Sequence, residues 1–598
     1  MKEIWNKTKW LWTILLVLVG VWFTTYMVQY LLLEPELFEK LTDEKWMLNR
    51  ACVLVVYLVV LCVTARVGLS VIISHTFFMV MAFVNYYVYL FRETEFIFPD
   101  LRSIGTGLSV AGKYKLELHE RGWLVIIASL IFFAIAGLFR IKFKRVKFLR
   151  LLSGLAAVWL CILISIETIG INTETWLQKG TYRNGYVLNF VLSARDSFVE
   201  QPEDYDLETI IDLEQEYKDK QENELGVNIE KDPTIIVVMN ESFADLRVIG
   251  DFQTNKPLTP FMDSLMDNTI KGYALSSVFG AKTPNSEWEF MTGGSMAFLP
   301  TGAIVYQQYL NDTPSSMVST LKNVGYTCVA MHPYYETGWS RNLVYPKLGF
   351  DESYFLDHFD KSQMIREYIS DEELYNKIIE RYENRKVNEK LFIMSISMQN
   401  HGGYATDYDN FEEKYYKVGR SYTDANQYFS LIRESDNALR DFVNYFWSVD
   451  EPVEIIFFGD HQPSLNRKFY EILNGKGLSG LTMKELEALY TVPFFIWTNY
   501  ETPEETVEIT SLNFLSSMAL ERAGIDLPPY NQFMLDLMEV IPAINARGYY
   551  SLEKGKYMHV EDALGKEAEW IKKYQSLQYN GMFDSRNVSD VFFPYLEE

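Results

Sequence analysis

Two acidic residues and a histidine of this chain follow apolar runs that predict buried strands. Glu241 comes just after the run 234–239, and Asp460 with His461 comes just after the run 455–459. Open α/β sheets bind ligands at the carboxyl ends of their strands, so the three side chains are expected near one another at such an edge. Two carboxylates and one imidazole could ligate a divalent metal ion there. Taken singly, these residues also fit a surface acid at a strand end and an ordinary turn.

Thr283 offers a hydroxyl group that such a site could activate. Pro284 suits the first position of a helix, so the sequence predicts Thr283 as the N-cap, where free N–H groups and the helix dipole favour a phosphate and a partly ionised oxygen. A threonine hydroxyl is a poor nucleophile near neutral pH and needs a base or a metal ion. With Glu241, Asp460 and His461 it would form an oxygen-rich set that suits Mn²⁺ or Mg²⁺. The alternative is a helix cap without chemistry.

Further residues suited to substrate contact also follow predicted strands. His401 comes just after the run 392–398, and His332 and Arg341 lie in the segment after the run 326–330. An arginine guanidinium can pair bidentately with a phosphate group. Only seven histidines occur in the chain, and three of them come just past predicted strands. A single histidine or arginine is more often structural, but this placement favours a shared sheet edge.

The elements that would position these residues alternate from residue 233 onward, which indicates an α/β sheet flanked by helices. The strand-like runs are 234–239, 326–330, 391–398, 454–458 and 493–497, and the helix-like runs are 259–268, 371–383, 423–446 and 510–523. Before them, the polar stretch 199–232 carries mixed charges at helical spacing, which fits a solvated helix and linker.

The first part of the chain predicts a membrane anchor. Five apolar stretches come close to the ~20 residues that a spanning helix needs. They are residues 10–33, 46–65, 67–91, 122–139 and 148–170. Basic residues concentrate at the amino terminus and between residues 140 and 150, and such positions are expected on the cytoplasmic side. Five spans would then export everything after about residue 171.

Charge separates the two halves of the chain. Residues 1–171 carry a net charge of +6 and the remainder −30, within the total of −24. So acidic an exported half argues against a nucleic-acid partner and against electrostatic docking to anionic headgroups. Cys328 is its only cysteine, so no disulfide can form within that half.

Five short motifs occur in an order that is typical of a known protein family. They are Met239-Asn240-Glu241-Ser242-Phe243, Lys282-Thr283 followed by Ser286-Glu287, Trp339-Ser340-Arg341, Asn400-His401, and Gly459-Asp460-His461-Gln462-Pro463. This set resembles the lipoteichoic acid synthase family of membrane phosphoglycerol transferases, within the sulfatase and alkaline phosphatase superfamily. That family also has five amino-terminal spans and an exported sulfatase-like domain, so the resemblance covers nearly the whole chain.

The resemblance implies a role for each matching residue. Glu241, Thr283, Asp460 and His461 match the positions that bind one Mn²⁺-type ion, with Thr283 as the nucleophile. Trp339, Arg341 and His401 match the positions that hold the glycerophosphate group, and His332 lies near them. Pro284 departs from the small or polar residue expected after the threonine, which affects the local loop and none of the ligands.

The resemblance also implies a reaction and a location. Phosphatidylglycerol would donate glycerol phosphate, through a glycerophosphoryl-threonine, to a glycerol phosphate polymer or a glycolipid at the outer face of the membrane of a Gram-positive-type bacterium. The chain would comprise an anchor with five transmembrane helices (1–171), a partly helical linker (172–232), a sulfatase-like catalytic domain (233–545) and a C-terminal segment packed on that domain (546–598).

Three alternatives stay open. A sulfatase or phosphatase would share the sheet and the metal, but sulfatases need Cys or Ser in Cys/Ser-x-Pro-x-Arg, where this chain has Thr283-Pro-Asn-Ser-Glu. A phosphoethanolamine transferase would share the threonine and the spans, with more histidine ligands for zinc. A membrane-tethered binding protein would have kept the fold and lost catalysis, but drift should then have damaged the ligand set.

Overall fold

A computed structural model of the chain describes most of its residues and divides them into two compact units. The described residues are 2–33, 41–92, 95–103, 118–138, 146–168, 171, 180–195, 197, 199, 201–224, 232–300, 302–310, 315–419 and 422–594. The N-terminal unit comprises Met1–Phe198 with Pro300–Gly302, and the C-terminal unit comprises Val199–Leu299 with Ala303–Glu598.

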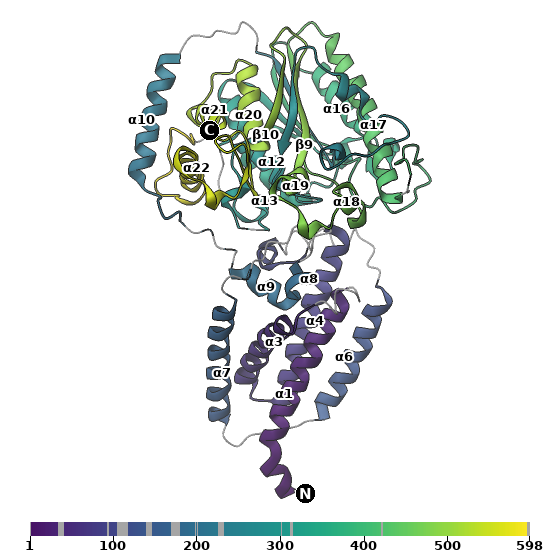
Figure 1. The fold of residues 1–598 in the computed structure, drawn as a ribbon, viewed down its shortest axis with the longest axis vertical. Helices are drawn as coiled ribbons and strands as arrows, with labels where there is room; N and C mark the ends of the chain where they lie inside the picture. Colours follow the sequence, from purple (N-terminus) through teal and green to yellow (C-terminus); the bar gives the residue numbers. More distant parts are fainter. Residues whose placement is uncertain are drawn as a thin grey trace. The chain divides into compact units, whose positions relative to one another are not determined.

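The N-terminal unit contains five helices long and apolar enough to cross a membrane (Figure 1). They are α1 (Lys2–Leu32), α3 (Asp43–Thr64), α4 (Val67–Arg92), α6 (Glu120–Leu138) and α7 (Val146–Glu167). Large apolar side chains stay exposed on their outer faces, for example Trp123 at 58% and Leu151 at 61%, as expected of surfaces that face lipid. The five predicted spans are confirmed. Most of the basic loop that sets the predicted orientation, Arg140–Arg145, lies outside the described residues.

A polar cluster lies buried among four of these helices. The ring of His75 on α4 makes two side-chain hydrogen bonds, one of 2.8 Å between Nδ1 and Thr24 Oγ1 and one of 2.9 Å between Nε2 and Ser129 Oγ. The Thr24 hydroxyl also lies 2.7 Å from the Tyr57 hydroxyl. These bonds connect α1, α3, α4 and α6, and such interhelical hydrogen bonds stabilise helix packing in a membrane.

The C-terminal unit is built on an eight-stranded sheet of order β10-β2-β9-β8-β1-β7-β3-β4. The strands are β1 (Thr234–Asn240), β2 (Thr269–Leu275), β3 (Tyr326–Met331), β4 (Glu352–Tyr354), β7 (Lys390–Ile396), β8 (Val453–Gly459), β9 (Thr491–Thr498) and β10 (Glu505–Ser511). Only β9 pairs antiparallel with its neighbours. The carboxyl ends of the other strands therefore meet at one edge, and the predicted α/β sheet is confirmed.

Three of these strands were missing from the sequence prediction, for a physical reason. The strand β10 lies at one end of the sheet, its residues from Glu505 to Glu508 are largely exposed, and its sequence alternates polar and apolar side chains. The strand β2 contains Lys271 and Gly272, and β4 spans only three residues. Partly exposed strands lack the continuous apolar run that identifies a buried one. In the same region the helix expected over 259–268 shortens to α11 (Pro260–Ser264).

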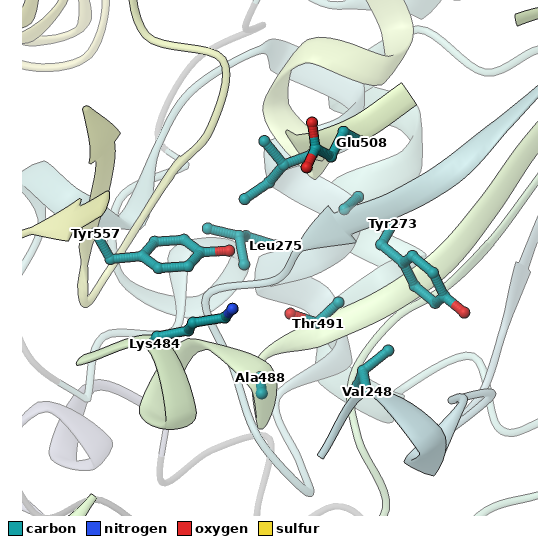
Figure 2. A pocket seen from close by; sticks show the side chains of 10 residues that line it. Val248, Tyr273, Leu275, Lys484, Ala488, Thr491, Glu508 and Tyr557 are labelled. Atoms are coloured by element: carbon teal, nitrogen blue, oxygen red, sulfur yellow. The ribbon is translucent and has the colours of Figure 1, made fainter. Parts of the chain in front are cut away.

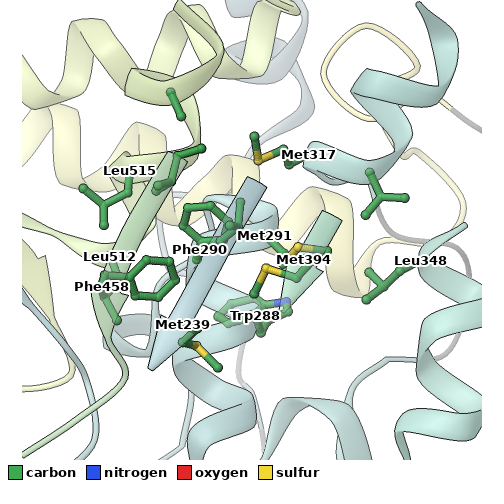
Figure 3. Close-up of a cluster of buried hydrophobic side chains, with 14 of the residues drawn as sticks. Met239, Trp288, Phe290, Met291, Met317, Leu348, Met394, Phe458, Leu512 and Leu515 are labelled. Atoms are coloured by element: carbon green, nitrogen blue, oxygen red, sulfur yellow. The ribbon is translucent and has the colours of Figure 1, made fainter. Parts of the chain in front are cut away.

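Helices cover both faces of the sheet (Figure 1). The helices α12 (Thr283–Thr292), α14 (Met317–Asn323) and α20 (Leu512–Arg522) share a large core with alternate residues of the strands. Figure 3 shows this core around Met239 of β1, Phe458 of β8, Phe290 of α12 and Leu515 of α20. The helices α16 (Asp371–Glu383) and α17 (Thr423–Trp447) lie on the other side of the sheet. Burial on both faces explains the apolar runs of β1 and β8.

The polar stretch before the sheet contributes a packed helix and not a solvated one. The helix α10 (Leu207–Glu224) buries Ile210, Leu213 and Tyr217, which recur at intervals of three and four residues and so share one face. They form a second core with α21 (Pro529–Val540) and the C-terminal helix α22 (Gly565–Phe583). The predicted linker 172–232 is therefore divided, because α8 (Gly180–Asn184) and α9 (Tyr186–Arg195) belong to the N-terminal unit.

Candidate active site

The pairing of β1 with β8 brings Glu241, Asp460 and His461 together. Asn240 and Gly459, the last residues of these two strands, pair in register, so the residues that follow them leave the sheet side by side. One ligand atom from each of the three side chains lies within 4.8 Å of those from the other two. All three residues are almost fully buried. The sheet thus converts two separate sequence motifs into one cluster.

Thr283 joins this cluster from the helix that follows β2. Its Oγ1 atom donates a hydrogen bond of 3.2 Å to Oε2 of Glu241. The prediction of Thr283 as an N-cap is wrong by one residue, because Lys282 occupies the cap and Thr283 begins α12. Lys282 adopts a left-handed conformation with φ of 71°, and this turn directs the chain into the helix. The hydroxyl still lies at the amino terminus of α12, where a phosphate is favoured.

Backbone groups fix the orientation of the ligand side chains. The N–H groups of Ser242 and His461 donate to Oδ1 of Asp460 at 2.7 and 2.8 Å. His461 Nδ1 lies 3.0 Å from the carbonyl oxygen of Gln462. Because a carbonyl oxygen only accepts, Nδ1 carries a proton, and Nε2 faces the cluster. Ser242 itself has a φ of 53°, a strained conformation of the kind that collects at functional sites.

Two buried atoms of this cluster lack a hydrogen-bond partner among the described residues and are suited to bind a cation. Asp460 Oδ2 and His461 Nε2 lie 3.3 Å apart, and in the part of the chain that the structure describes neither has a hydrogen-bond partner. Buried polar atoms rarely remain so. Burial and the nearby Glu241 carboxylate raise the pKa of Asp460 above its ordinary value. A divalent ion would satisfy both atoms and stabilise both carboxylates in their charged form, so these residues fit a metal ion with mixed oxygen and nitrogen ligands.

Arg341 is fixed by two residues that lie away from the metal cluster. Its Nε and Nη2 atoms donate to Oε2 of Glu287 at 3.1 and 2.9 Å, and Nη1 lies 3.1 Å from His332 Nε2. Arg341 and Glu287 are both buried to within about 1% exposure. Glu287 follows Thr283 by four residues on α12, so one helix carries the hydroxyl and the carboxylate that holds the arginine. Glu287 was not among the predicted site residues, although its place one helical turn after Thr283 was a usable signal.

His332 contacts Arg341, and both of its ring nitrogens have partners. Arginine only donates, so Nε2 of His332 accepts its hydrogen bond, and Nδ1 must donate to the carbonyl oxygen of Ile396 at 3.1 Å. Burial and the adjacent guanidinium group lower the pKa of His332 well below its usual value, which keeps the ring neutral. In this structure His332 therefore orients Arg341, and its role as a direct substrate contact stays a prediction.

Trp339 and His401, the other predicted substrate contacts, are less buried. Trp339 lies in the short helix η4 (Gly338–Ser340), where it and Ser340 both have positive φ values, 53° and 61°. Two strained residues in sequence indicate a segment held in place by its surroundings. His401 follows β7, and its Nδ1 atom lies 3.1 Å from the Tyr368 hydroxyl. The strand order β8-β1-β7-β3 places the segments carrying His401 and Arg341 on the β7 and β3 side of the cluster.

A separate pocket of about 170 Å³ lies toward the other end of the sheet (Figure 2). Leu275, Thr491 and Tyr557 line it, together with the charged side chains of Lys484 and Glu508. Leu275 ends β2, at the same sheet edge as the metal cluster. None of the residues predicted for the site lines this pocket. The chemistry therefore follows from the converging side chains and not from the pocket.

Comparison with known proteins now adds to this geometry. The sulfatase family model matches residues 233–525. These residues form a sulfatase-family domain. Its boundaries enclose every residue of the cluster and every predicted substrate contact, from Glu241 to His461.

Two curated proteins that resemble this chain carry different names. A Rhizobium meliloti protein named for cyclic beta-1,2-glucan modification is 28% identical over 429 residues, 70% of this chain and 65% of that protein. Lipoteichoic acid synthase 1 of Bacillus subtilis is 26% identical over 256 residues, 41% of this chain and 39% of that protein. The chain thus spans less than two thirds of the length of each.

A solved structure shares the fold of the sulfatase-family domain. The Streptococcus pyogenes phosphoglycerol transferase GacH, in complex with sn-glycerol-1-phosphate, superposes with a TM-score of 0.54 at 21% identity. The superposition covers 66% of this chain and 99% of that one. At this identity the likeness concerns the fold, and the chemistry of this chain has to be argued from its own residues.

Proposed function

We propose that this chain is a membrane-bound phosphoglycerol transferase that carries glycerol phosphate on Thr283. One observation carries the proposal. The Thr283 hydroxyl lies at the amino terminus of α12, bonded to Glu241, beside two buried ligand atoms that need a cation. A lipoteichoic acid synthase among the relatives and a phosphoglycerol transferase of the same fold support this choice over other reactions of sulfatase-like domains.

Glu241, Thr283, Asp460 and His461 would hold one divalent ion, Mn²⁺ or Mg²⁺. Bound there, such an ion supplies positive charge that favours an ionised threonine oxygen and stabilises the phosphoryl oxygens. Oxygen atoms predominate among the four side chains, which favours these two metals over a structural zinc ion. Arg341, held by Glu287 and His332, adds a fixed positive charge near the reacting group.

The first displacement takes glycerol phosphate from the lipid. Oγ1 of Thr283 attacks the phosphorus of phosphatidylglycerol while its proton passes to Glu241, which already accepts a hydrogen bond from it. The bond from phosphorus to the diacylglycerol oxygen breaks, and His401 gives that oxygen a proton. Trp339 and Arg341 hold the glycerophosphate group, which is now esterified to Thr283.

The second displacement transfers the group to an acceptor. An acceptor hydroxyl attacks phosphorus, His401 takes the proton it loses, and the bond to Thr283 Oγ1 breaks as Glu241 returns its proton to that oxygen. The acceptor would be a glycerol phosphate polymer or a glycolipid. The five spans keep the enzyme at the bilayer that contains its donor, with the C-terminal unit outside the cell membrane of a Gram-positive-type bacterium. The strong negative charge of the exported part argues against a nucleic-acid partner.

The covalent intermediate gives a direct test. Full-length protein is mixed with phosphatidylglycerol and Mn²⁺ without an acceptor, and its intact mass and peptide masses are measured. The proposal predicts a glycerophosphoryl group on Thr283 and one equivalent of diacylglycerol released. Thr283→Ala should show neither, and Thr292→Ala, at the last residue of α12, should behave as the wild type.

Other outcomes point to other reactions. Continuous release of free glycerol phosphate, equally fast with and without an acceptor, would identify a hydrolase. Adduct formation only from phosphatidylethanolamine would identify a phosphoethanolamine transferase. An unmodified Thr283 during active turnover would remove the residue from its proposed role.

A further inference from the structure

We propose that Tyr368 is a positioning residue that fixes the ring of His401 for proton transfer. This inference rests on the proposed function and concerns the proton of the entering and leaving oxygen. Tyr368 begins β6 (Tyr368–Ile369), which pairs with β5 (Met364–Ile365) in a small hairpin apart from the main sheet. Its hydroxyl lies 3.1 Å from His401 Nδ1, and the two ring centroids are 5.2 Å apart. The Tyr368 hydroxyl thus contacts the edge of the imidazole, and its ring packs beside it at an interplanar angle of 50°.

The same hairpin also holds the backbone of His401. Arg366, between the two short strands, donates from Nη2 to the carbonyl oxygens of Gln399 and His401 at 2.8 and 2.6 Å. Its Nη1 atom donates to Gln427 Oε1 at 3.3 Å. Arg366 is only 4% exposed, although arginine is rarely buried without a carboxylate partner. The buried Arg366 guanidinium group thus binds two main-chain carbonyl oxygens. These bonds hold the turn that carries His401 in a defined position.

Further contacts fix the conformation of Arg366. The rings of Tyr368, Tyr404 and Tyr408 surround its guanidinium group at 5.6, 5.5 and 5.8 Å, within the range of cation–π attraction. Asn410 donates to the Arg366 carbonyl oxygen at 3.0 Å. Arg366 has a φ of 58°, a strained conformation that persists only where the surroundings enforce it. The hairpin is therefore a rigid support for His401.

This arrangement suits a histidine that must act as an acid and then as a base. If Nδ1–H donates to the phenol oxygen, the bond is the same whether Nε2 carries a proton or not. Nε2 then gives its proton to the diacylglycerol oxygen in the first displacement and takes one from the acceptor hydroxyl in the second. Tyr368 keeps Nε2 directed at the reacting oxygen in both steps, as the third residue of a catalytic triad orients its base.

The test compares two leaving groups in the full-length protein. Diacylglycerol leaves as a strongly basic alkoxide and needs a proton, whereas p-nitrophenolate is a stable anion that leaves without one. Tyr368→Phe should lower kcat with phosphatidylglycerol about 10- to 100-fold with little change in KM, by analogy with other orienting residues. It should leave the first-turnover burst of p-nitrophenolate from the p-nitrophenyl ester of glycerol phosphate, measured without an acceptor, within twofold of the wild type, because that burst precedes the second displacement.

Two controls make the result specific. Tyr445→Phe removes a similar bond, 2.9 Å to Glu383 Oε1, between α16 and α17, and should change neither rate. In a His401→Ala background, Tyr368→Phe should cause no further loss, because the group it orients is already gone. Equal losses on both substrates, an unchanged rate on both, or additive losses in the double variant would each overturn the inference. A wild type that transfers nothing from phosphatidylglycerol would instead overturn the proposed function on which it rests.

Discussion

Each of the two units buries a histidine among polar side chains, and the two environments differ in one respect. In the N-terminal unit, both ring nitrogens of His75 have partners, Thr24 at 2.8 Å and Ser129 at 2.9 Å. In the C-terminal unit, His461 Nε2 and Asp460 Oδ2 face each other at 3.3 Å without a hydrogen bond within the described residues. A network whose members are paired stabilises packing, whereas buried ligand atoms without hydrogen-bond partners cost stability unless a cation binds them.

Unsatisfied ligand atoms distinguish the functional polar cluster from the structural one. Burial alone does not do so, because His75 and His461 are both at most 1% exposed. Sequence context alone does not do so either, because a histidine within a membrane span is the more unusual of the two. The presence of unsatisfied ligand atoms that point at one another is what marks the second cluster as a site.

The largest loss of activity is expected when one of the four proposed metal ligands is replaced. Asp460→Asn keeps the size of the side chain and removes a charge from the cluster, so transfer from phosphatidylglycerol should fall on the order of 10³-fold. The matched change in the N-terminal unit is Ser129→Ala, which removes one partner of His75 and should leave the rate within about twofold of the wild type. Comparable losses in the two variants would erase the distinction between the clusters.

A somewhat smaller loss of transfer activity is expected when Arg341, which lies outside the metal cluster, loses its partner Glu287. Glu287→Gln leaves the Arg341 guanidinium buried without a counter-charge, which should cost about 3–5 kcal/mol of unfolding free energy and lower transfer about 100-fold. Glu352→Gln disrupts the pair with Arg381, where Glu352 is 34% exposed, and should cost at most about 1 kcal/mol. Chemical denaturation of both variants measures the difference. Equal losses of unfolding free energy in the two variants would show that the burial of Glu287 does not strengthen its contribution to stability.

A single buried carboxylate should affect stability and leave activity unchanged. Burial raises the pKa of Glu487 from 4.5 to about 7, with Asn545 as a hydrogen-bond donor. The folded state keeps the proton that the unfolded state loses, so this residue costs stability as pH rises from 4.5 to 7, by about 3 kcal/mol in all.

Glu487→Gln should therefore raise Tm more at pH 8 than at pH 5, at unchanged transfer rate. Thermal melts across this pH range measure the difference. A parallel shift at both pH values would show that Glu487 does not titrate with folding.

The smallest effect is expected within the membrane helices. Thr24→Val removes the hydroxyl that links Tyr57 and His75 and should cost about 0.6 to 1.7 kcal/mol of stability, as for other hydrogen bonds between membrane helices. Unfolding in mixed micelles measures this cost, and Phe77→Leu on the exposed face of α4 is the control. A loss of transfer activity in Thr24→Val would give the N-terminal cluster a role beyond packing.

Much of the site was predictable because its residues follow strongly apolar strands. The runs before Glu241 and Asp460 are continuous and fully buried, so their strand character is plain in the sequence. The sheet rule then places their carboxyl ends at one edge. Thr283 was found by the helix start that Pro284 signals, with an error of one residue in the cap.

The rest could not be read from the sequence because it depends on long-range contacts. Glu287 and Arg341 are separated by 54 residues, and no local pattern pairs them. The contact of His332 Nδ1 with the carbonyl oxygen of Ile396 likewise joins residues 64 positions apart. Tyr368 belongs to a hairpin of two-residue strands, too short for any periodicity to show.

Metal content is the most direct test of the central claim, that four side chains at this sheet edge bind one divalent ion. The full-length wild type and Asp460→Asn are stripped with a chelator, titrated with Mn²⁺ and followed by calorimetry. The structure predicts one ion per wild-type chain, with a stabilisation of about 2.7 kcal/mol at a hundredfold excess over Kd, and no such binding by the variant. Equal binding by both proteins, or none by the wild type, would contradict it.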